Sequence, residues 1–385
     1  MRFDAKVSEY LLELLRCALN DAMPDEKPEN VAWENVFLMA KKHSVISLSF
    51  HAVQKLKNGP EPELMKKWST RNAKLLAQCV NQETEYCALT TCFEEHEIPF
   101  LPLKGSVIRD LFPMPHLREM SDIDILVPVD KIQEACALAE SMDYKIVSTG
   151  SHHVALQKPP YMNLELHTGL IAPTYEYYEY YKDPWEKTYL QKDHFWYGMK
   201  NEDVYLYLLT HSAKHYYYSG TGIRSVIDIY LFNRAYRDSM DQEYIARELK
   251  KLNLEAFADQ MEALSEYWFS ENGSEASADV TEMQAYILTS ATYGTKNTRR
   301  ENDLRRYMRK GKSEKKAKTA MFLHMVFLPC DEMQLMFPIL KKVPVLLPFC
   351  WIARWVRILF TKPKSISSSY KTVHDIQLQN NNKES

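Results

Sequence analysis

The sequence predicts an α+β protein, in which a small mixed β-sheet is flanked by helical units on its N-terminal and C-terminal sides. Glycine is scarce, with only 10 residues in a chain of 385, and this favours helices over a turn-rich all-β fold. Apolar residues recur at helical spacing through most of the chain. Between residues 98 and 172 they instead form short runs of the kind that strands make. We therefore expect an α/β core at residues 98–172, preceded by a helical unit at 1–97 and followed by another at 173–360.

The N-terminal unit is expected to be helical throughout. Leucines recur at helical spacing over residues 11–19, and apolar residues do so again over residues 33–40. Proline-containing breaks near Pro28 and Pro60 separate the helices, because proline cannot continue a regular helix. A long polar helix over about residues 62–95 completes the unit.

Five short apolar runs in the central segment are candidate strands. They cover residues 98–103, 123–127, 144–148, 153–157 and 161–167. Between the second and third runs, residues 131–142 have helical periodicity, with Ile132, Ala135 and Ala139 on one face. Strands interrupted by a helix predict a small α/β unit with a mixed sheet.

Helices are expected again from residue 174 onward. The candidates cover residues 204–217, 223–235, 242–252, 256–269 and 281–291. The next segment, residues 296–318, is rich in arginine and lysine. A solvated helix is the first interpretation of this basic segment, and contact with anionic lipid or nucleic acid is the alternative.

An apolar run at residues 343–353 is bounded by basic residues. It is shorter than the ~20 residues that span a bilayer, and Pro344 and Pro348 interrupt it. We favour docking of this run on the protein's own core over a position in a membrane interface, which would make the protein a peripheral membrane protein. The polar residues 361–385 are predicted to form a disordered tail.

The overall composition limits the partners and the compartment. A net charge of −3 gives no general attraction to nucleic acid, so nucleic acid is not an expected partner. The seven cysteines form no C-x-x-C pair and their number is odd, which argues against a disulfide framework or a structural zinc site. The N-terminus lacks the apolar core of a signal peptide. We expect a cytoplasmic protein, with the inner face of the membrane as the other location that the basic C-terminal region suggests.

Two aspartates stand at the second candidate strand, one just before it and one within it. Side chains alternate between the faces of a strand, so Asp122 and Asp124 point to one face and Ile123 points to the other. Two carboxylates side by side repel each other and are costly to desolvate. A divalent cation that prefers oxygen ligands, Mg²⁺ or Mn²⁺, removes that cost. The alternative is an exposed strand end with two solvated acids.

Two neighbouring motifs strengthen the metal-site interpretation. Gly105 and Ser106 follow the first candidate strand and open a helix. Glycine permits a phosphate to approach the backbone closely, the helix N-terminus offers free N–H groups, and serine adds a hydroxyl. Downstream, Glu165 lies between two leucines in the last candidate strand, where a buried carboxylate needs a partner.

In this order, the motifs resemble those of the nucleotidyltransferase superfamily with the polymerase-beta-like fold. That pattern has a glycine followed by glycine or serine, then a pair of acids with apolar neighbours, and a third acid on a later strand. It corresponds here to Gly105 with Ser106, Asp122 with Asp124, and Glu165. With Lys104 and Arg118 included, the sequence is also similar to a bacterial family of uncharacterised nucleotidyltransferases, over roughly residues 7–360.

The sequence departs from the superfamily pattern in two places. The spacer between Ser106 and Asp122 is long, which indicates an inserted loop around residues 113–119. The third acid, Glu165, is a glutamate instead of the commoner aspartate. Both differences bear on where a second metal ion or a general base would lie.

The resemblance implies a two-metal, in-line displacement at the α-phosphate of a nucleoside triphosphate. It implies catalytic and metal-binding roles for Asp122, Asp124 and Glu165, with Mg²⁺ or Mn²⁺ as the cofactor. Both aspartates would hold the ion that carries the triphosphate. The glutamate would complete a second metal site or take the proton of the acceptor.

The resemblance also implies a set of nucleotide-binding residues. They are Lys104, Gly105, Ser106 and Arg118. The glycine and the serine would bind the β- and γ-phosphates, and the two cations would neutralise charge on the leaving pyrophosphate. Each cation has a structural alternative, because a lysine before a glycine turn is often solvated and Arg118 could pair with Glu119 or Asp110.

Three residues are candidates for the acceptor side of the site. They are His167, His211 and Asp228. The first shares a strand face with Glu165. The second forms an i, i+4 pair with His215, which is metal-ligand spacing, but a substrate-facing or core-edge pair is favoured. The third follows Arg224 at the same spacing, and an intrahelical ion pair is the simpler alternative.

From these motifs we expect an enzyme that moves a nucleoside monophosphate from a nucleoside triphosphate to a hydroxyl acceptor. ATP is the expected donor, and the acceptor is a small molecule, a sugar or a protein side chain. The alternative is a non-catalytic nucleotide sensor that docks a partner or a membrane through its basic C-terminal region. The three acids favour the enzyme, because a sensor has no need of all of them.

Overall fold

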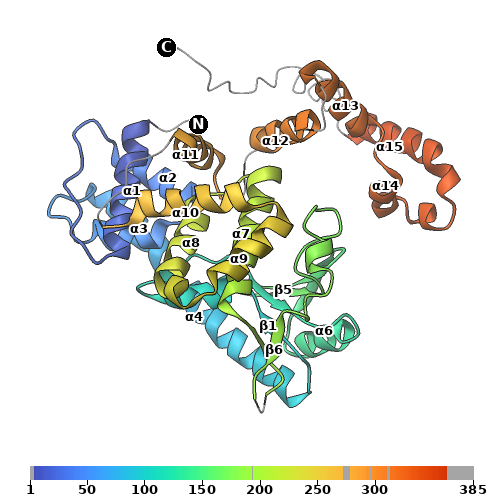
Figure 1. Cartoon of the computed structure of the whole chain (residues 1–385), viewed down its shortest axis with the longest axis horizontal. Helices are drawn as coiled ribbons and strands as arrows, with labels where there is room; N and C mark the ends of the chain where they lie inside the picture. Colours follow the sequence, from blue (N-terminus) through green and yellow to red (C-terminus); the bar gives the residue numbers. More distant parts are fainter. Residues whose placement is uncertain are drawn as a thin grey trace. The chain divides into compact units, whose positions relative to one another are not determined.

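The computed structural model describes residues 4–192, 194–271, 278–292, 294, 296–309 and 313–361. It confirms the predicted α+β class (Figure 1). Residues 362–385 of the predicted polar tail, and Lys310 and Lys312 of the basic segment, lie outside the described residues. The chain forms two compact units. One comprises Met1–Tyr216 and Thr221–Tyr293, and the other Tyr217–Gly220 and Gly294–Ser385.

The central sheet of the first unit contains all five predicted strands. In spatial order they are β1 (Leu101–Pro102), β2 (Ile123–Leu126), β5 (Met162–His167), β4 (His153–Lys158) and β3 (Lys145–Thr149). Strands β2 and β5 are parallel, and every other neighbouring pair is antiparallel. The sheet is therefore mixed, as predicted.

The prediction that only helices follow residue 174 is wrong for one segment. Strands β6 (Thr188–Leu190) and β7 (Tyr197–Met199) form a two-stranded antiparallel sheet. The start of β7 and the segment before it also bond to Phe100, whose amide donates to the Phe195 carbonyl at 3.1 Å and whose carbonyl accepts from the Tyr197 amide at 2.7 Å. Three-residue strands are too short to give a periodic signal, so the pairing partner decides their structure.

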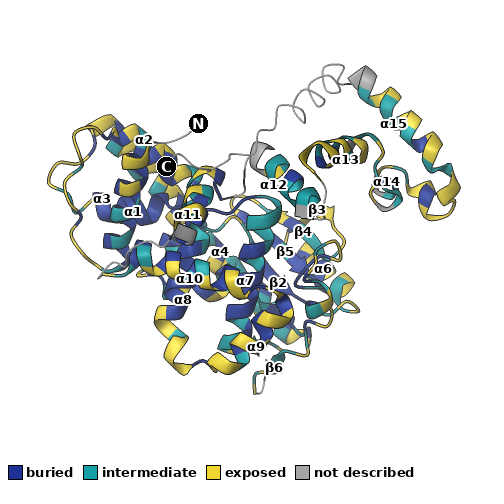
Figure 2. Ribbon diagram, turned by 45° about the horizontal axis from the view of Figure 1, so that its top comes forward, coloured by how far each residue is buried: buried dark blue, intermediate teal, exposed yellow. Residues whose placement is uncertain are grey.

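Alternation along the strands separates a buried face of the sheet from a polar one. Ile123 and Ile125 of β2 and the leucines of β5 belong to a core cluster with side chains of α4 (Pro62–Glu95) and α6 (Ile132–Ser141). Figure 2 shows buried residues concentrated in the strands and on the inward sides of the helices. The opposite face carries Asp124 and Glu165, because these residues alternate with the apolar ones.

The N-terminal helices α1 (Ala5–Leu19), α2 (Trp33–Lys42) and α3 (Ile46–Val53) pack with the start of α4. Trp68 of α4 is fully buried, and its ring meets those of Trp33 and Phe37 edge-on. Its indole N–H donates to the Ile46 carbonyl at 3.3 Å, so this N–H keeps a hydrogen-bond partner although the side chain is buried. This packing holds α3 in place next to Glu119, whose carboxylate accepts from the Ser47 amide at 3.2 Å.

Helices return after β7, as predicted. They are α7 (Asn201–Tyr218), α8 (Ile223–Tyr236), α9 (Gln242–Leu252), α10 (Glu255–Phe269) and α11 (Ala278–Ser290). The Asp241 side chain caps α9 by accepting from the Tyr244 amide at 2.9 Å, and Asn253 ends it in the left-handed conformation.

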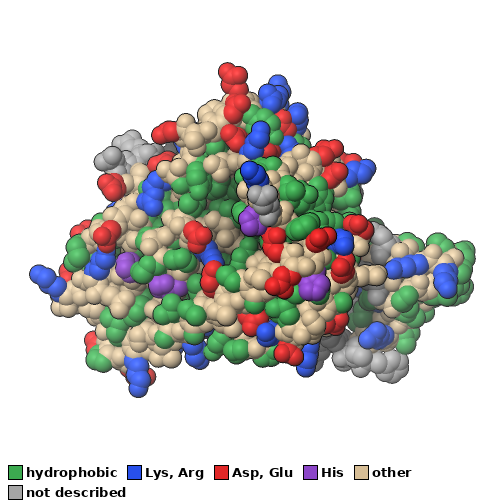
Figure 3. Space-filling model, turned by 90° about the horizontal axis from the view of Figure 1, so that it is seen from below, with side chains coloured by type: hydrophobic (Ala, Val, Ile, Leu, Met, Phe, Trp, Pro, Cys, Tyr) green, Lys and Arg blue, Asp and Glu red, His purple; other side chains and the backbone are tan. Residues whose placement is uncertain are grey.

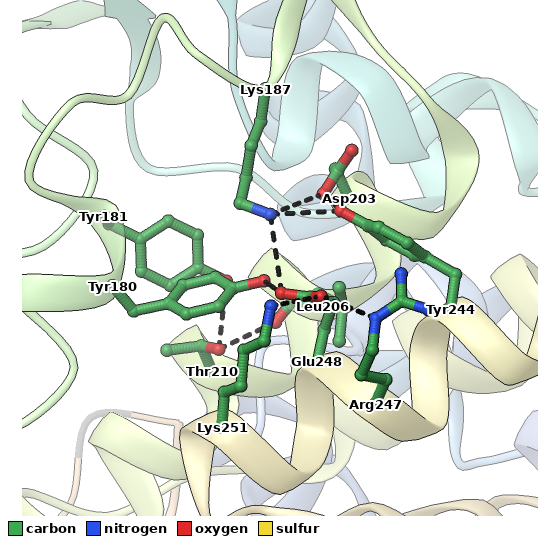
Figure 4. A network of polar contacts seen from close by, with 10 residues as sticks. All are labelled: Tyr180, Tyr181, Lys187, Asp203, Leu206, Thr210, Tyr244, Arg247, Glu248 and Lys251. Carbon is green, nitrogen blue, oxygen red and sulfur yellow. Dashed lines mark hydrogen bonds and ion pairs between the residues drawn. The ribbon is translucent and has the colours of Figure 1, made fainter.

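A buried polar network ties α7 and α9 to the segment after β5 (Figure 4). Glu248 of α9 is 4% exposed and accepts from the Tyr180 hydroxyl at 2.9 Å. Asp203 of α7 accepts from the Tyr244 hydroxyl at 2.7 Å and from the Lys187 ammonium at 3.3 Å. Because buried carboxylates are stable only when they are paired, this network fixes the position of α7.

The second unit contains helices α12 (Lys296–Arg309), α13 (Glu314–Val326), α14 (Cys330–Met336) and α15 (Leu347–Thr361). One side of α15 packs within this unit, where Cys350 joins Met333 and Leu340 in a small core. Phe349 and Ile352 on α15 stay exposed. In the lobe at the right of Figure 3, the place of α14 and α15 in Figure 1, hydrophobic and basic side chains lie next to each other. No helix in the described part of the chain is long and apolar enough to cross a membrane.

Candidate active site

A cleft of about 280 Å³ lies between the polar face of the central sheet and helices α7 and α8. Nine of the ten residues predicted for the site line it, and Ser106 does not. The nine are Lys104, Gly105, Arg118, Asp122, Asp124, Glu165, His167, His211 and Asp228. The residues come from segments more than 100 positions apart, so the fold assembles the site.

Asp124 is the most constrained carboxylate in the cleft. Its Oδ1 accepts from the Lys104 ammonium at 3.1 Å and interacts with Nε2 of His167 at 2.7 Å. Burial alone would raise the pKa of Asp124, but the Lys104 ammonium and the His167 hydrogen bond hold that pKa well below its usual range. Asp124 is therefore ionised, and its Oδ2 has no hydrogen bond from a described residue.

Asp122 and Glu165 complete the group of acids. Burial and the neighbouring Asp124 raise the pKa of Asp122, whose carboxylate accepts from the Ser121 hydroxyl at 2.9 Å. The hydrogen bond from His167, at 3.3 Å, lowers the pKa of Glu165. Three carboxylates at one place leave an excess of negative charge, which a divalent cation would neutralise.

Ligand atoms of Asp124, Glu165 and His167 lie within 4.8 Å of one another. Such a group can hold a metal ion. The metal ligands predicted from the sequence were Asp122, Asp124 and Glu165, so His167 is an addition to them. The oxygen-rich donor set fits Mg²⁺ or Mn²⁺.

The chain turns sharply into the cleft at Lys104, which has a positive φ of 46°. Gly105 follows and starts α5 (Gly105–Ile108). A Cβ at position 105 would lie 2.5 Å from Nη1 of Arg118 and 3.0 Å from the Met120 side chain. Glycine is therefore required here because the arginine side chain passes directly over the backbone.

The amides that follow Gly105 are not free, contrary to the prediction. The Ser106 amide donates to the Leu103 carbonyl at 3.2 Å, and the Val107 and Ile108 amides donate to the Lys104 carbonyl. The turn is so tight that the carbonyls before the helix accept these bonds. The Ser106 hydroxyl is buried, with no partner among the described residues, so it does not face the cleft.

Arg118 pairs with Asp228 of α8. Its Nε donates to Oδ1 at 2.8 Å and its Nη2 to Oδ2 at 2.7 Å, and both side chains are buried. The expected structural alternatives for Arg118 are wrong, because Glu119 accepts from amides of α3 and Asp110 faces Arg109. A bidentate pair between segments 110 residues apart holds α8 against the cleft.

The other helical residues of the site come from α7. Nε2 of His211 lies 3.3 Å from Nε2 of His215, and burial lowers the pKa of His211 well below its ordinary value, so the ring is neutral. Lys214 is on the same helix and lines the same cleft. Burial, followed by repulsion from Lys104, lowers its pKa to about 8.

Sequence reasoning did not single out three of the titratable residues that line the cleft. They are His152, His153 and Lys214. The sequence did contain a signal for His153. Pro159 and Pro160 indicate a turn, and a hairpin around that turn pairs His153 with His167. Lys214 lies three residues after His211, which places both on one side of α7.

We expect Lys214 to react with acetic anhydride at a pH far below that of an ordinary lysine. With a pKa of about 8 instead of 10.5, its amine is neutral at mildly alkaline pH, so the rate of acetylation should rise through a midpoint near 8. Competitive labelling followed by mass spectrometry measures the midpoint for each lysine. Half-buried Lys131, whose pKa is raised by its hydrogen bond to Glu134, serves as the control. Equal midpoints for the two lysines would contradict the prediction.

Comparison with known proteins gives one match. The model of a family described as an uncharacterised nucleotidyltransferase matches residues 29–270. No curated protein and no solved structure matches the chain. The matched segment contains the whole central sheet, α7, α8 and all ten predicted site residues.

Proposed function

The chain belongs to the family of uncharacterised nucleotidyltransferases, and we propose that it transfers a nucleoside monophosphate from a nucleoside triphosphate to a hydroxyl group. ATP is the expected donor, and a small molecule, a sugar or a protein side chain is the acceptor. The observation that carries the proposal is the convergence of Asp122, Asp124 and Glu165 in one cleft.

Asp122, Asp124 and Glu165 would hold two divalent cations, Mg²⁺ or Mn²⁺. The fit is supported by the closeness of the ligand atoms of Asp124 and Glu165 and by the raised pKa of Asp122, which reflects burial and repulsion between acids. When bound, such ions orient the triphosphate, stabilise charge on its oxygens and favour ionisation of the acceptor hydroxyl.

The cations of the chain itself would prepare the donor side. Lys104 keeps Asp124 ionised through their ion pair. Arg118 uses Nε and Nη2 on Asp228, which leaves Nη1, next to Gly105, for a phosphate oxygen of the donor. Asp228 is then a positioning residue for Arg118 instead of a contact for the acceptor.

In the proposed reaction, the acceptor oxygen attacks the α-phosphorus while the bond to the β-phosphate oxygen breaks. Pyrophosphate leaves, and the acceptor proton goes to Glu165, whose exposed fraction of 29% keeps it accessible from the cleft. His211 and Lys214 of α7 lie in the same cleft and would contact the acceptor. His167 orients Asp124 and Glu165 through Nε2, which lies 2.7 Å from Oδ1 of Asp124 and 3.3 Å from Oε2 of Glu165.

A thermal-shift panel of the four nucleoside triphosphates with Mg²⁺ or Mn²⁺ tests the proposal. We expect stabilisation that needs both the metal and the nucleotide, and that disappears in the Asp122→Ala/Asp124→Ala variant. The nucleotide that stabilises most would then be used, labelled at its α-phosphate, to screen acceptors.

Two outcomes would overturn the proposal. The absence of any shift with every metal–nucleotide pair would remove the support for the site. Stabilisation without transfer of label to any class of hydroxyl acceptor would favour the nucleotide sensor.

A further inference from the structure

We propose that the cleft holds a second kind of metal site, in which His152, His153 and His167 bind a divalent transition-metal ion such as Zn²⁺. This site uses nitrogen ligands and adjoins the carboxylates proposed for Mg²⁺. It does not depend on the proposed nucleotidyl transfer, because a metal ion can bind the histidines in the absence of nucleotide.

The three histidines meet because of the strand register. His153 of β4 lies directly opposite His167 of β5, and residues in such pairs project from the same face. His152 precedes β4, and its carbonyl accepts from the Thr168 amide at 2.8 Å. One ring nitrogen of each histidine lies within 4.8 Å of the others, and the ring centroids are 4.9–5.7 Å apart.

His167 has the arrangement of a metal ligand. Its side chain is only 4% exposed, Nε2 is bonded to Asp124 at 2.7 Å, and Nδ1 is buried with no partner among the described residues. Histidines that bind metals usually donate their other ring N–H to a carboxylate, which fixes the tautomer and leaves a lone pair for the ion. Asp124 would serve as that carboxylate, with Nδ1 of His167 as the ligand atom.

His153 and His152 are suited to complete the site. Nδ1 of His153 is also buried, and no described residue is its partner. Gly150 makes room for the His153 ring, since a Cβ at position 150 would lie 3.0 Å from it.

Three imidazoles select the type of ion. Mg²⁺ and Ca²⁺ prefer oxygen ligands, whereas imidazole suits Zn²⁺ and the neighbouring transition metals. Three protein ligands also leave a coordination position open, as in catalytic zinc sites, and here that position would face the cleft. A water molecule or an oxygen of a cleft ligand could occupy it.

Titration of the full-length, chelator-treated protein with Co²⁺, without nucleotide, tests the proposal. Co²⁺ substitutes for Zn²⁺ and gives visible absorption bands that report nitrogen ligation. We expect one equivalent to bind, to be displaced by Zn²⁺ and to be unaffected by millimolar Mg²⁺.

Three variants assign the site. His153→Ala should weaken Co²⁺ binding at least ~10²-fold, because removal of a supporting outer residue alone typically costs 10–100-fold. His215→Ala is the matched control, since it removes a histidine of the same cleft that is outside the cluster. Asp122→Asn should leave Co²⁺ binding unchanged. His153→Asn, measured after circular dichroism has shown it to be folded, separates ligation from a folding defect.

The proposal is overturned if no Co²⁺ absorption develops, if His215→Ala abolishes it, or if Asp122→Asn abolishes it and His153→Ala does not. The last result would place the ion on the carboxylates. These results are independent of the nucleotide panel, so the histidine site and the nucleotidyl transfer can fail separately.

Discussion

Nucleotidyl transfer is expected to fall at least ~10²–10³-fold when Asp124 is replaced by asparagine, the cost that removal of one electrostatic stabiliser of a transition state usually carries. The change keeps the size of the side chain but removes its charge. It therefore weakens metal binding and also leaves Lys104 without the carboxylate that balances its partly buried ammonium. The rate of transfer of the α-phosphate label to the acceptor, at saturating nucleotide, measures the effect.

Glu119→Gln is the matched control for this experiment. Glu119 is as buried as Asp124, but it does not line the cleft and instead accepts from the amides of Ile46 and Ser47 at the start of α3. We expect the control to lose stability and to keep its transfer rate below the melting temperature. Equal losses of rate in both variants would show that Asp124 acts through stability alone.

The second large effect is expected at the ion pair between Arg118 and Asp228. Arg118→Met leaves the Asp228 carboxylate buried and unpaired, and breaking such a pair from one side costs ~3–5 kcal/mol of unfolding free energy. Urea unfolding followed by circular dichroism measures the change. Replacing both partners, as Arg118→Met with Asp228→Leu, should recover most of the loss, because no unpaired charge remains.

An exposed pair provides the comparison. Arg237 is 53% exposed and pairs with Glu262, so Arg237→Met should cost less than ~1 kcal/mol. If the Arg118 variant cost no more than the Arg237 variant, the pair with Asp228 would not be holding α8 against the cleft.

Much of the fold could be predicted from the sequence. The strands at residues 123–126 and 162–167 are short apolar runs whose alternation also places Asp124 and Glu165 on one face. The long helices carry periodic patterns that extend over several turns. These features depend on residues near one another in the chain, so a single sequence contains the information.

The contacts within the site could not be predicted, because they form between residues that are far apart in the sequence. Nothing near Arg118 indicates that its partner is Asp228, 110 residues later. The amides after Gly105 looked free in the sequence, but the tightness of the turn decided that they are bonded. The small sheet of β6 and β7 likewise forms where the start of β7 meets Phe100.

The sequence by itself therefore determined the fold class, the five central strands, and the polar face on which three acids stand. Only the tertiary structure decided which residues surround those acids. It placed His152 and His153 beside His167, Lys104 on Asp124, and Lys214 in the same cleft. The physical reason is that alternation and helical periodicity are local properties, whereas strand register and helix docking are set by packing between distant segments.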